Sequence, residues 1–136
     1  MGRPAHFEIQ AKNMERAKKF YQNVFGWDIQ KWQSPGTEVD YWLIMTGKMS
    51  KSPDVERDVY GIDGGMGTDF PMKDLNAYVV TMDVMDLDET CQKVEENDGK
   101  LVTEKMTVPG VGYMRYAEDT EGNYFGMMEA DETAKM

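Results

Sequence analysis

The chain has 136 residues and a mass of 15.6 kDa, with 40% apolar residues, 29% charged residues and a mean hydropathy of −0.64. These values are typical of one soluble globular domain, and no run approaches the roughly 20 apolar residues that span a bilayer, so we expect no membrane partner. The formal net charge of −10 repels a phosphate backbone, which argues against nucleic acid as a partner. The single cysteine, Cys91, and an N-terminus without an apolar signal stretch predict a cytoplasmic location.

The first half of the chain predicts a strand followed by an amphipathic helix. Residues 6–10 alternate, with Phe7 and Ile9 on one strand face and His6, Glu8 and Gln10 on the other. A helix is predicted over 14–25, with Asn13 as its N-cap and Gly26 as its end. Its apolar stripe contains Ala17, Phe20, Tyr21, Val24 and Phe25. Extended segments are predicted at 27–32, 39–46 and 59–66, with a loop or lid at 48–58 and a linker at 67–73.

The second half predicts the same order of elements. A strand at 76–82 precedes a helix that begins at Asp86, where Glu89 completes a capping box. Leu87, Cys91 and Val94 form the apolar stripe of this helix, which makes Cys91 a core residue. The helix ends at residues 97–99, and a further strand is predicted at 101–105.

A β-hairpin closes the chain. Two β-prone runs, 113–117 and 124–129, flank residues 119–123, where Gly122 supplies the positive φ of a tight turn. In the second run Phe125, Met127 and Glu129 share one face. If this face lines a pocket, Glu129 is a candidate metal ligand or base; if Glu129 is the last exposed residue before the acidic tail 130–136, it has no such role.

The two halves read as repeats of strand, helix and three strands. The Pro35–Gly36 and Pro109–Gly110 pairs fall at matching places, each shortly after a strand that follows a helix ending in glycine. The copies span about 5–66 and 75–129. Neither copy buries its sheet alone, so the pattern predicts one α+β domain made from both.

Three segments carry a family resemblance: HFEI, ERAKKFYQNVFGW and PGVGYMRYAEDTEGNYFGMME. Together with the repeat, they resemble the vicinal oxygen chelate superfamily and are most similar to its small glyoxalase/bleomycin resistance/dioxygenase-like domain proteins. The chain departs from the common closing motif at Thr120, where proline is usual. The resemblance implies a single domain over 1–136, with two βαβββ modules that form a cup-shaped eight-stranded sheet. It also implies a homodimer.

The resemblance further implies a site for a divalent metal such as Zn, Ni, Co, Mn or Fe. Carried over by position, His6 and Glu129 are the metal ligands, Glu129 is also the catalytic carboxylate, and Asn76, at the start of the second module, is a weak ligand. The fourth position falls near Gly65 and Met66, and Met66 suits a hard cation poorly. Glu8 and Asp63 are the candidate substitute ligands. Because the chain has one histidine, a site of two histidines and one carboxylate for iron is excluded within a single chain.

These polar residues also have interpretations other than a metal site. A lone histidine that opens a strand is often a hydrogen-bonded structural residue. Tyr113 and Arg115 share a strand face, where the guanidinium either clamps a carboxylate or phosphate of a small ligand or pairs with an acidic neighbour.

Two functions follow from the resemblance. The first is a lyase or isomerase that acts on a small oxygenated metabolite, with His6 and Glu129 at a divalent metal. The second is a metal-free protein of the bleomycin-resistance kind, which binds a small-molecule ligand and breaks no bond. The sequence names neither the substrate nor the metal.

Overall fold

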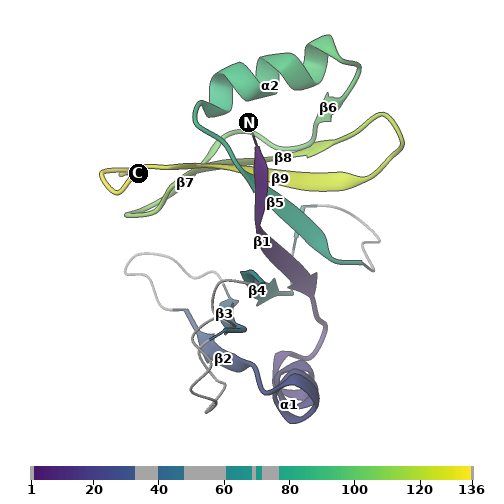
Figure 1. Ribbon diagram of the computed structural model, residues 1–136, viewed down its shortest axis with the longest axis vertical. Helices are drawn as coiled ribbons and strands as arrows, with labels where there is room; N and C mark the ends of the chain where they lie inside the picture. The colour runs from purple at the N-terminus through teal and green to yellow at the C-terminus, as the bar shows by residue number, and fades with distance from the viewer. Residues whose placement is uncertain (1, 33–39, 48–60, 69, 72–76, 136) are drawn as a thin grey trace. The chain divides into compact units, whose positions relative to one another are not determined.

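The structure is a computed structural model that describes residues 2–32, 40–47, 61–68, 70–71 and 77–135. The chain forms two compact units (Figure 1). The N-terminal unit contains His6–Phe70 and Leu75–Tyr78, and the C-terminal unit contains Met1–Ala5, Pro71–Asp74 and Val79–Met136. Strand β1 contributes its first residues to the C-terminal unit and the remainder, from His6 onward, to the N-terminal unit. No helix in the described part of the chain is long and apolar enough to cross a membrane.

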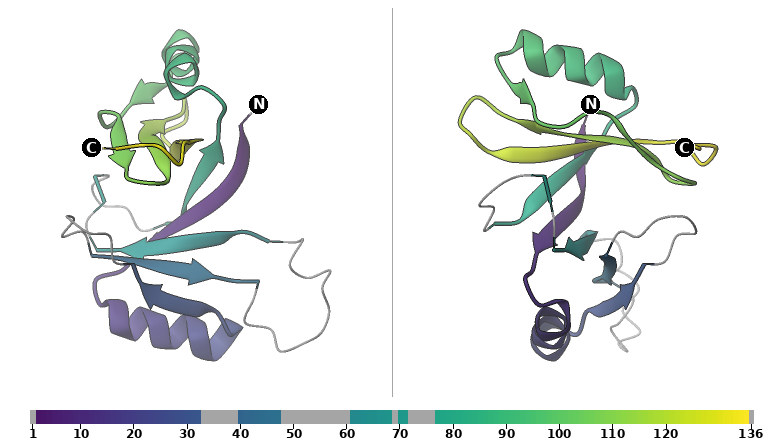
Figure 2. Two further views of the ribbon diagram at one scale, coloured as in Figure 1. Left: turned by 90° about the vertical axis from the view of Figure 1, so that its left-hand side faces the viewer. Right: turned by 180° about the vertical axis from the view of Figure 1, so that it is seen from behind.

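The N-terminal unit is a sheet with one helix along one face (Figure 2). Its elements are β1 (Arg3–Gln10), α1 (Met14–Phe25), β2 (Asp28–Lys31), β3 (Tyr41–Met45) and β4 (Asp63–Gly67). The strand order is β2-β3-β4-β1, with β1 parallel to β4 and the other pairs antiparallel. The core lies between sheet and helix and contains Phe7, Ile9, Met14, Ile29, Trp42, Ile44 and Met66. The predicted loop at 48–58 and the Pro35–Gly36 turn lie outside the described residues.

Helix α1 begins and ends at the predicted residues. The Asn13 side chain accepts a hydrogen bond from the backbone N–H of Arg16, and Gly26 adopts the left-handed conformation with φ 71°. The predicted apolar stripe is wrong in part, because Phe20, Val24 and Phe25 remain exposed. The N-terminal core covers Met14 and partly covers Ala17 and Tyr21, and it leaves the other flank of the helix exposed.

The C-terminal unit repeats this order with one extra strand. Its elements are β5 (Val79–Asp83), α2 (Leu87–Glu96), β6 (Lys100–Leu101), β7 (Met106–Val108), β8 (Gly112–Glu118) and β9 (Tyr124–Ala130). The strand order is β5-β9-β8-β6, with β7 also paired to β8. Strand β5 is parallel to β9, as β1 is to β4. The predicted strand at 101–105 is therefore wrong in extent, since pairing stops at Leu101 and resumes at Met106.

Helix α2 has the predicted cap and core face. The Asp86 carboxylate accepts a hydrogen bond from the backbone N–H of Glu89 at 3.0 Å. Leu87 and Cys91 are buried, and Val94 packs against them from a partly buried position. Helix α2 lies over β8 and β9 (Figure 1).

The closing hairpin joins β8 to β9 through residues 119–123. Gly122 has φ 85°, as predicted, and the Asp119 carboxylate accepts the backbone N–H groups of Glu121 and Asn123. These hydrogen bonds hold the pKa of Asp119 below its usual range.

The two units share one topology, and this confirms the predicted fold class of two βαβββ modules. In each unit the first strand lies parallel to the last, and the last is paired with the strand before it. Glu8 and Thr81 hold equivalent places, because each lies six residues before the first residue of its helix. Each also pairs with a glycine, Gly65 opposite Glu8 and Gly126 opposite Thr81.

Candidate functional site

The face of the N-terminal sheet away from α1 carries the polar residues of β1. Phe7 and Ile9 point into the core, so the alternation of the strand places His6 and Glu8 on the opposite face, as predicted. His6 lies opposite Asp63 in the parallel β1–β4 pair, and Glu8 lies opposite Gly65. Glu8 is only 4% exposed, which is unusual for a carboxylate.

His6 is hydrogen-bonded to a residue that the sequence did not single out. Its Nε2 lies 2.9 Å from the hydroxyl oxygen of Tyr41 on β3, and the tautomer of the imidazole decides which group donates. Strand β4 separates β1 from β3, so the tyrosine side chain must cross it. No local sequence pattern indicates Tyr41, because the contact depends on strand order.

Gly65 makes this crossing possible. A Cβ at Gly65 would lie 1.7 Å from the Tyr41 hydroxyl oxygen and 2.0 Å from the ring carbon that bears it, far inside any van der Waals distance. The absence of a side chain at Gly65 thus lets Tyr41 lie flat on the sheet and reach His6. The resemblance supplied no metal ligand near Gly65 and Met66. In the structure the Tyr41 ring packs over Gly65.

The environment of His6 favours its neutral form. Burial lowers the pKa of His6 below 6.5, and the negative charge of Asp63 opposes this shift less strongly. The Asp63 carboxylate is itself engaged, since its Oδ1 accepts the backbone N–H of Thr46 at 2.8 Å. At neutral pH the imidazole is therefore an uncharged donor or acceptor beside a phenol hydroxyl.

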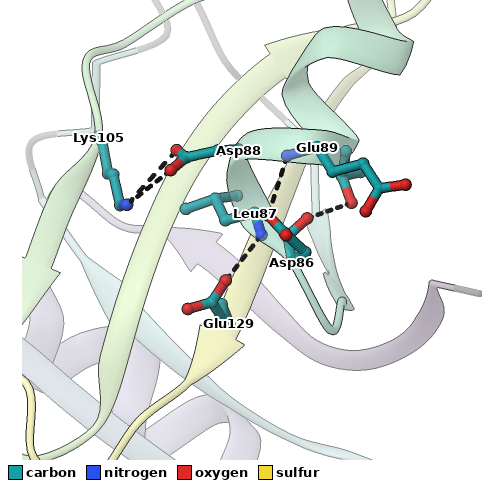
Figure 3. Close-up of polar contacts among 7 residues, drawn as sticks. Asp86, Leu87, Asp88, Glu89, Lys105 and Glu129 are labelled. Atoms are coloured by element: carbon teal, nitrogen blue, oxygen red, sulfur yellow. Dashed lines mark hydrogen bonds and ion pairs between the residues drawn. The ribbon is translucent and has the colours of Figure 1, made fainter.

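Glu129 lies in the other unit, on the sheet face that carries α2. Phe125 and Met127, which share its face as predicted, pack in the core beneath that helix. The Oε1 of Glu129 accepts the backbone N–H of Leu87, the first residue of α2, at 2.8 Å (Figure 3). A carboxylate at this place satisfies a free N–H group at the helix start and complements the helix dipole.

Tyr113 and Arg115 also lie on the helix-facing side of the C-terminal sheet. They pair in register with Glu129 and Met127 of β9, which places them on one face as predicted. Arg115 Nε donates to the carbonyl oxygen of Thr103, and its guanidinium hydrogen-bonds the thiol of Cys91 under the helix. The guanidinium therefore links the loop at Thr103 to the core residue Cys91. Burial raises the pKa of the Cys91 thiol, and the positive charge of Arg115 partly opposes this.

The predicted metal site is not assembled among the described residues. Within the described residues, no group of three or more His, Cys, Asp or Glu side chains comes together as a metal site. His6 and Glu129 belong to different units, and each is hydrogen-bonded to another protein group. Asn76 lies outside the described residues. His6, Glu8 and Tyr41 are thus the candidate ligand-contacting residues that the N-terminal unit brings onto one face.

Thr81 is a second residue that the sequence did not indicate. It occupies the place of Glu8 in the C-terminal repeat, is 3% exposed, and its hydroxyl has no hydrogen-bond partner in the part of the chain that is described. Only the alignment of the two repeats identifies this position.

Comparison with known proteins gives the fold and the family. The profile of the Glyoxalase/Bleomycin resistance protein/Dioxygenase superfamily matches residues 3–127. A glyoxylase-like domain-containing protein of Didymella fabae is 30% identical over 125 residues, which cover 90% of this chain and 89% of that protein.

Solved structures with low sequence identity share the fold. A hypothetical protein from Bacillus halodurans C-125 superposes with a TM-score of 0.69 at 13% identity and covers 99% of both chains. Methylmalonyl-CoA epimerase from Mycobacterium tuberculosis superposes with a TM-score of 0.61 at 15% identity, covering 94% of this chain and 87% of that one. The chain therefore belongs to the glyoxalase/bleomycin resistance protein/dioxygenase superfamily, within the vicinal oxygen chelate proteins that its motifs resemble.

Proposed function

We propose that the chain is a metal-independent small-molecule-binding protein of this superfamily, and that its ligand contacts His6 and Tyr41. The observation that carries the proposal is the hydrogen bond between these two side chains above Gly65. A neutral imidazole and a phenol offer donors and acceptors that match a carbonyl or carboxylate oxygen. The ligand class is accordingly a small oxygenated metabolite.

Both predicted metal ligands are hydrogen-bonded to other protein groups, which supports the metal-independent role. To coordinate a cation, His6 Nε2 would have to give up Tyr41, and Glu129 Oε1 would have to give up the backbone N–H of Leu87. A catalytic metal site usually has three protein ligands, and the described residues supply no such group. No step of the proposed function passes through a metal.

A lyase or isomerase is the second candidate, and Glu8 is the observation that favours it. This carboxylate lies on the same face of β1 as His6, two residues along, and is 4% exposed. A buried carboxylate suits a general base that moves a proton beside a carbonyl group. One solved structure with the same fold is a methylmalonyl-CoA epimerase in complex with methylmalonyl-CoA, with a TM-score of 0.67 at 11% identity. In this reading the catalytic carboxylate is Glu8 and not Glu129.

Calorimetric titration with a panel of small oxo acids and hydroxy acids tests the binding role. For any acid that binds, we expect His6→Gln and Tyr41→Phe each to weaken binding about 10-fold, since each removes one buried hydrogen bond of about 1.4 kcal/mol. Glu129→Gln is the matched control and should leave affinity unchanged. Equal affinities for wild type and both site variants would refute the assignment.

Two further measurements separate the alternatives. Titration with nickel, cobalt or zinc that shows stoichiometric binding, abolished by His6→Ala, would replace this proposal with the metal site. For the second candidate, incubation of the bound acid in D₂O should place deuterium on the carbon beside the carbonyl. Glu8→Gln should stop this exchange while binding persists, and exchange that survives Glu8→Gln would remove Glu8 as the base.

We further propose a cytoplasmic location, in keeping with a single, buried thiol that forms no internal disulfide. Association into a homodimer also remains a proposal.

A further inference from the structure

Thr81 on β5 carries a buried hydroxyl that lacks a partner. Met82, the next residue of the strand, packs beneath α2, so the alternation of β5 places Thr81 on the opposite face of the C-terminal sheet. The side chain is 3% exposed, and its Oγ1 has no hydrogen-bond partner among the described residues. In the unfolded chain water satisfies this hydroxyl, so its burial without a partner lowers the stability of the folded chain. A bound molecule that pairs with the hydroxyl removes this penalty.

A glycine lets this hydroxyl lie over the neighbouring strand β9. Gly126 is opposite Thr81 in the parallel β5–β9 pair. A Cβ at Gly126 would lie 2.7 Å from Thr81 Oγ1, inside the usual van der Waals distance, and the three atoms nearest to it all belong to Thr81. The hydroxyl therefore lies where a side chain at residue 126 would otherwise stand.

A hydroxyl also lies over the corresponding glycine of the N-terminal unit, but that hydroxyl has a partner. The Tyr41 side chain crosses Gly65, and its hydroxyl is hydrogen-bonded to His6. The C-terminal residue at the place of His6 is Val79, since each lies eight residues before the first residue of its helix. A valine side chain neither donates nor accepts a hydrogen bond. The second unit thus repeats the hydroxyl over a glycine, at Gly126, without repeating its partner.

The surroundings of Thr81 favour an uncharged partner. Val79 is buried, and Met114 and Met128, which form the next cross-strand pair on this face, are partly buried. The described residues that flank Thr81 on this face of β5, β8 and β9 include the exposed Asp83 and no basic side chain. A carboxylate bound here would lose water without gaining a cation, whereas a neutral carbonyl oxygen accepts the hydroxyl proton at a smaller desolvation cost. The unbranched methionine side chains suit an apolar substituent.

We propose that the hydroxyl of Thr81 binds the carbonyl oxygen of an uncharged molecule, a ketone, ester or amide, whose apolar part contacts Met114 and Met128. The carbonyl oxygen takes the role that the imidazole has for the tyrosine hydroxyl of the N-terminal unit. This site uses residues of the C-terminal unit alone and goes beyond the binding proposed at His6 and Tyr41. The two sites are tested with different molecules and different variants, so either can fail while the other stands.

Methyl NMR of the full chain labelled with [methyl-¹³C]methionine tests the site, with acetophenone as the neutral probe. The signals are assigned with Met114→Leu and Met128→Leu. We expect acetophenone to shift both signals saturably, with a dissociation constant of about 1–10 mM, and to shift the signal of Met85, which is 92% exposed beside α2, less. Benzoate has the same ring and a charged carboxylate, so it should need a concentration about 10-fold higher for the same shift. Signals that move no more than that of Met85, or that move equally with benzoate, would overturn the proposal.

Thr81→Val tests the hydroxyl itself, because valine keeps the shape of the side chain. It should weaken acetophenone binding about 10-fold, the effect of one lost buried hydrogen bond. It should also raise the melting temperature of the ligand-free chain by about 3–5 °C, since the unpaired hydroxyl is gone. Thr107→Val makes the same change opposite Tyr113, on the α2 side of the sheet, and should leave acetophenone affinity unchanged.

Two results with Thr81→Val would contradict the assignment. Acetophenone binding as tight as in the wild type would show that the hydroxyl does not contact the carbonyl group. A melting temperature that does not rise would show that the hydroxyl is already paired in the free protein, which removes the reason to assign it a ligand.

Discussion

Removal of the Glu129 carboxylate should destabilise helix α2. Glu129 is the residue for which the sequence offered a metal or catalytic role, and its Oε1 instead accepts the backbone N–H of Leu87 at 2.8 Å. In Glu129→Ala this N–H loses its acceptor at a half-buried helix start. In Glu129→Gln an amide oxygen still accepts the hydrogen bond, but the negative charge beside the helix N-terminus is gone.

The two substitutions should differ in size. A hydrogen bond to a charged group contributes about 1.5–3 kcal/mol, so we expect Glu129→Ala to lower the free energy of unfolding by about 2 kcal/mol. The charge–dipole part contributes about 0.3–1 kcal/mol, so Glu129→Gln should cost less than 1 kcal/mol. At about 3–5 °C per kcal/mol for a chain of this size, the melting temperature should fall by about 6–10 °C and about 1–5 °C respectively.

Urea unfolding followed by circular dichroism measures the free energy of unfolding. Amide hydrogen exchange of Leu87 reports the hydrogen bond from its N–H to Glu129. Glu104→Ala, which removes an exposed carboxylate from a loop, is the matched control and should change stability by less than about 0.5 kcal/mol. A Glu129→Ala variant as stable as the control, with unchanged exchange at Leu87, would refute the capping role.

Three further outcomes follow from the N-terminal unit. Because the pKa of His6 is lowered in the folded chain, the unfolded chain binds a proton at higher pH than the folded chain does. The free energy of unfolding should therefore fall as the pH drops below about 6.5, and His6→Gln should reduce this dependence in urea unfolding at pH 5–8. The pKa of Tyr21 is raised to about 12 by burial and by the Tyr78 hydroxyl, and absorbance titration with circular dichroism at each pH should show one late tyrosine that titrates earlier in Tyr78→Phe. Gly65→Ala should destabilise by about 1–3 kcal/mol by displacing Tyr41, and the double variant Gly65→Ala/Tyr41→Ala should lose less than the sum of the single losses; strict additivity in urea unfolding would contradict the steric role of Gly65.

The parts of this protein that depend on neighbouring residues could be predicted from the sequence. Asn13 and Gly26 bound α1, Asp86 caps α2, and Gly122 turns the closing hairpin, because caps and turns are decided within a few residues. The repeat of strand, helix and strands followed from periodicity, and the family resemblance implied the fold class. The alternation of β1 and β9 also held, since side chains in a strand must alternate.

Only the tertiary structure decided what the polar residues contact. Alternation placed Glu129 on one face of its strand, but whether that face meets a pocket or a helix depends on where α2 packs. The hydrogen bond between Tyr41 and His6 requires β4 between β3 and β1 and a glycine at residue 65 in β4. No local sequence pattern predicts it. The exposure of Phe20, Val24 and Phe25 has the same origin, because helical spacing defines an apolar stripe but the packing of the helix in the fold determines how much of it is covered.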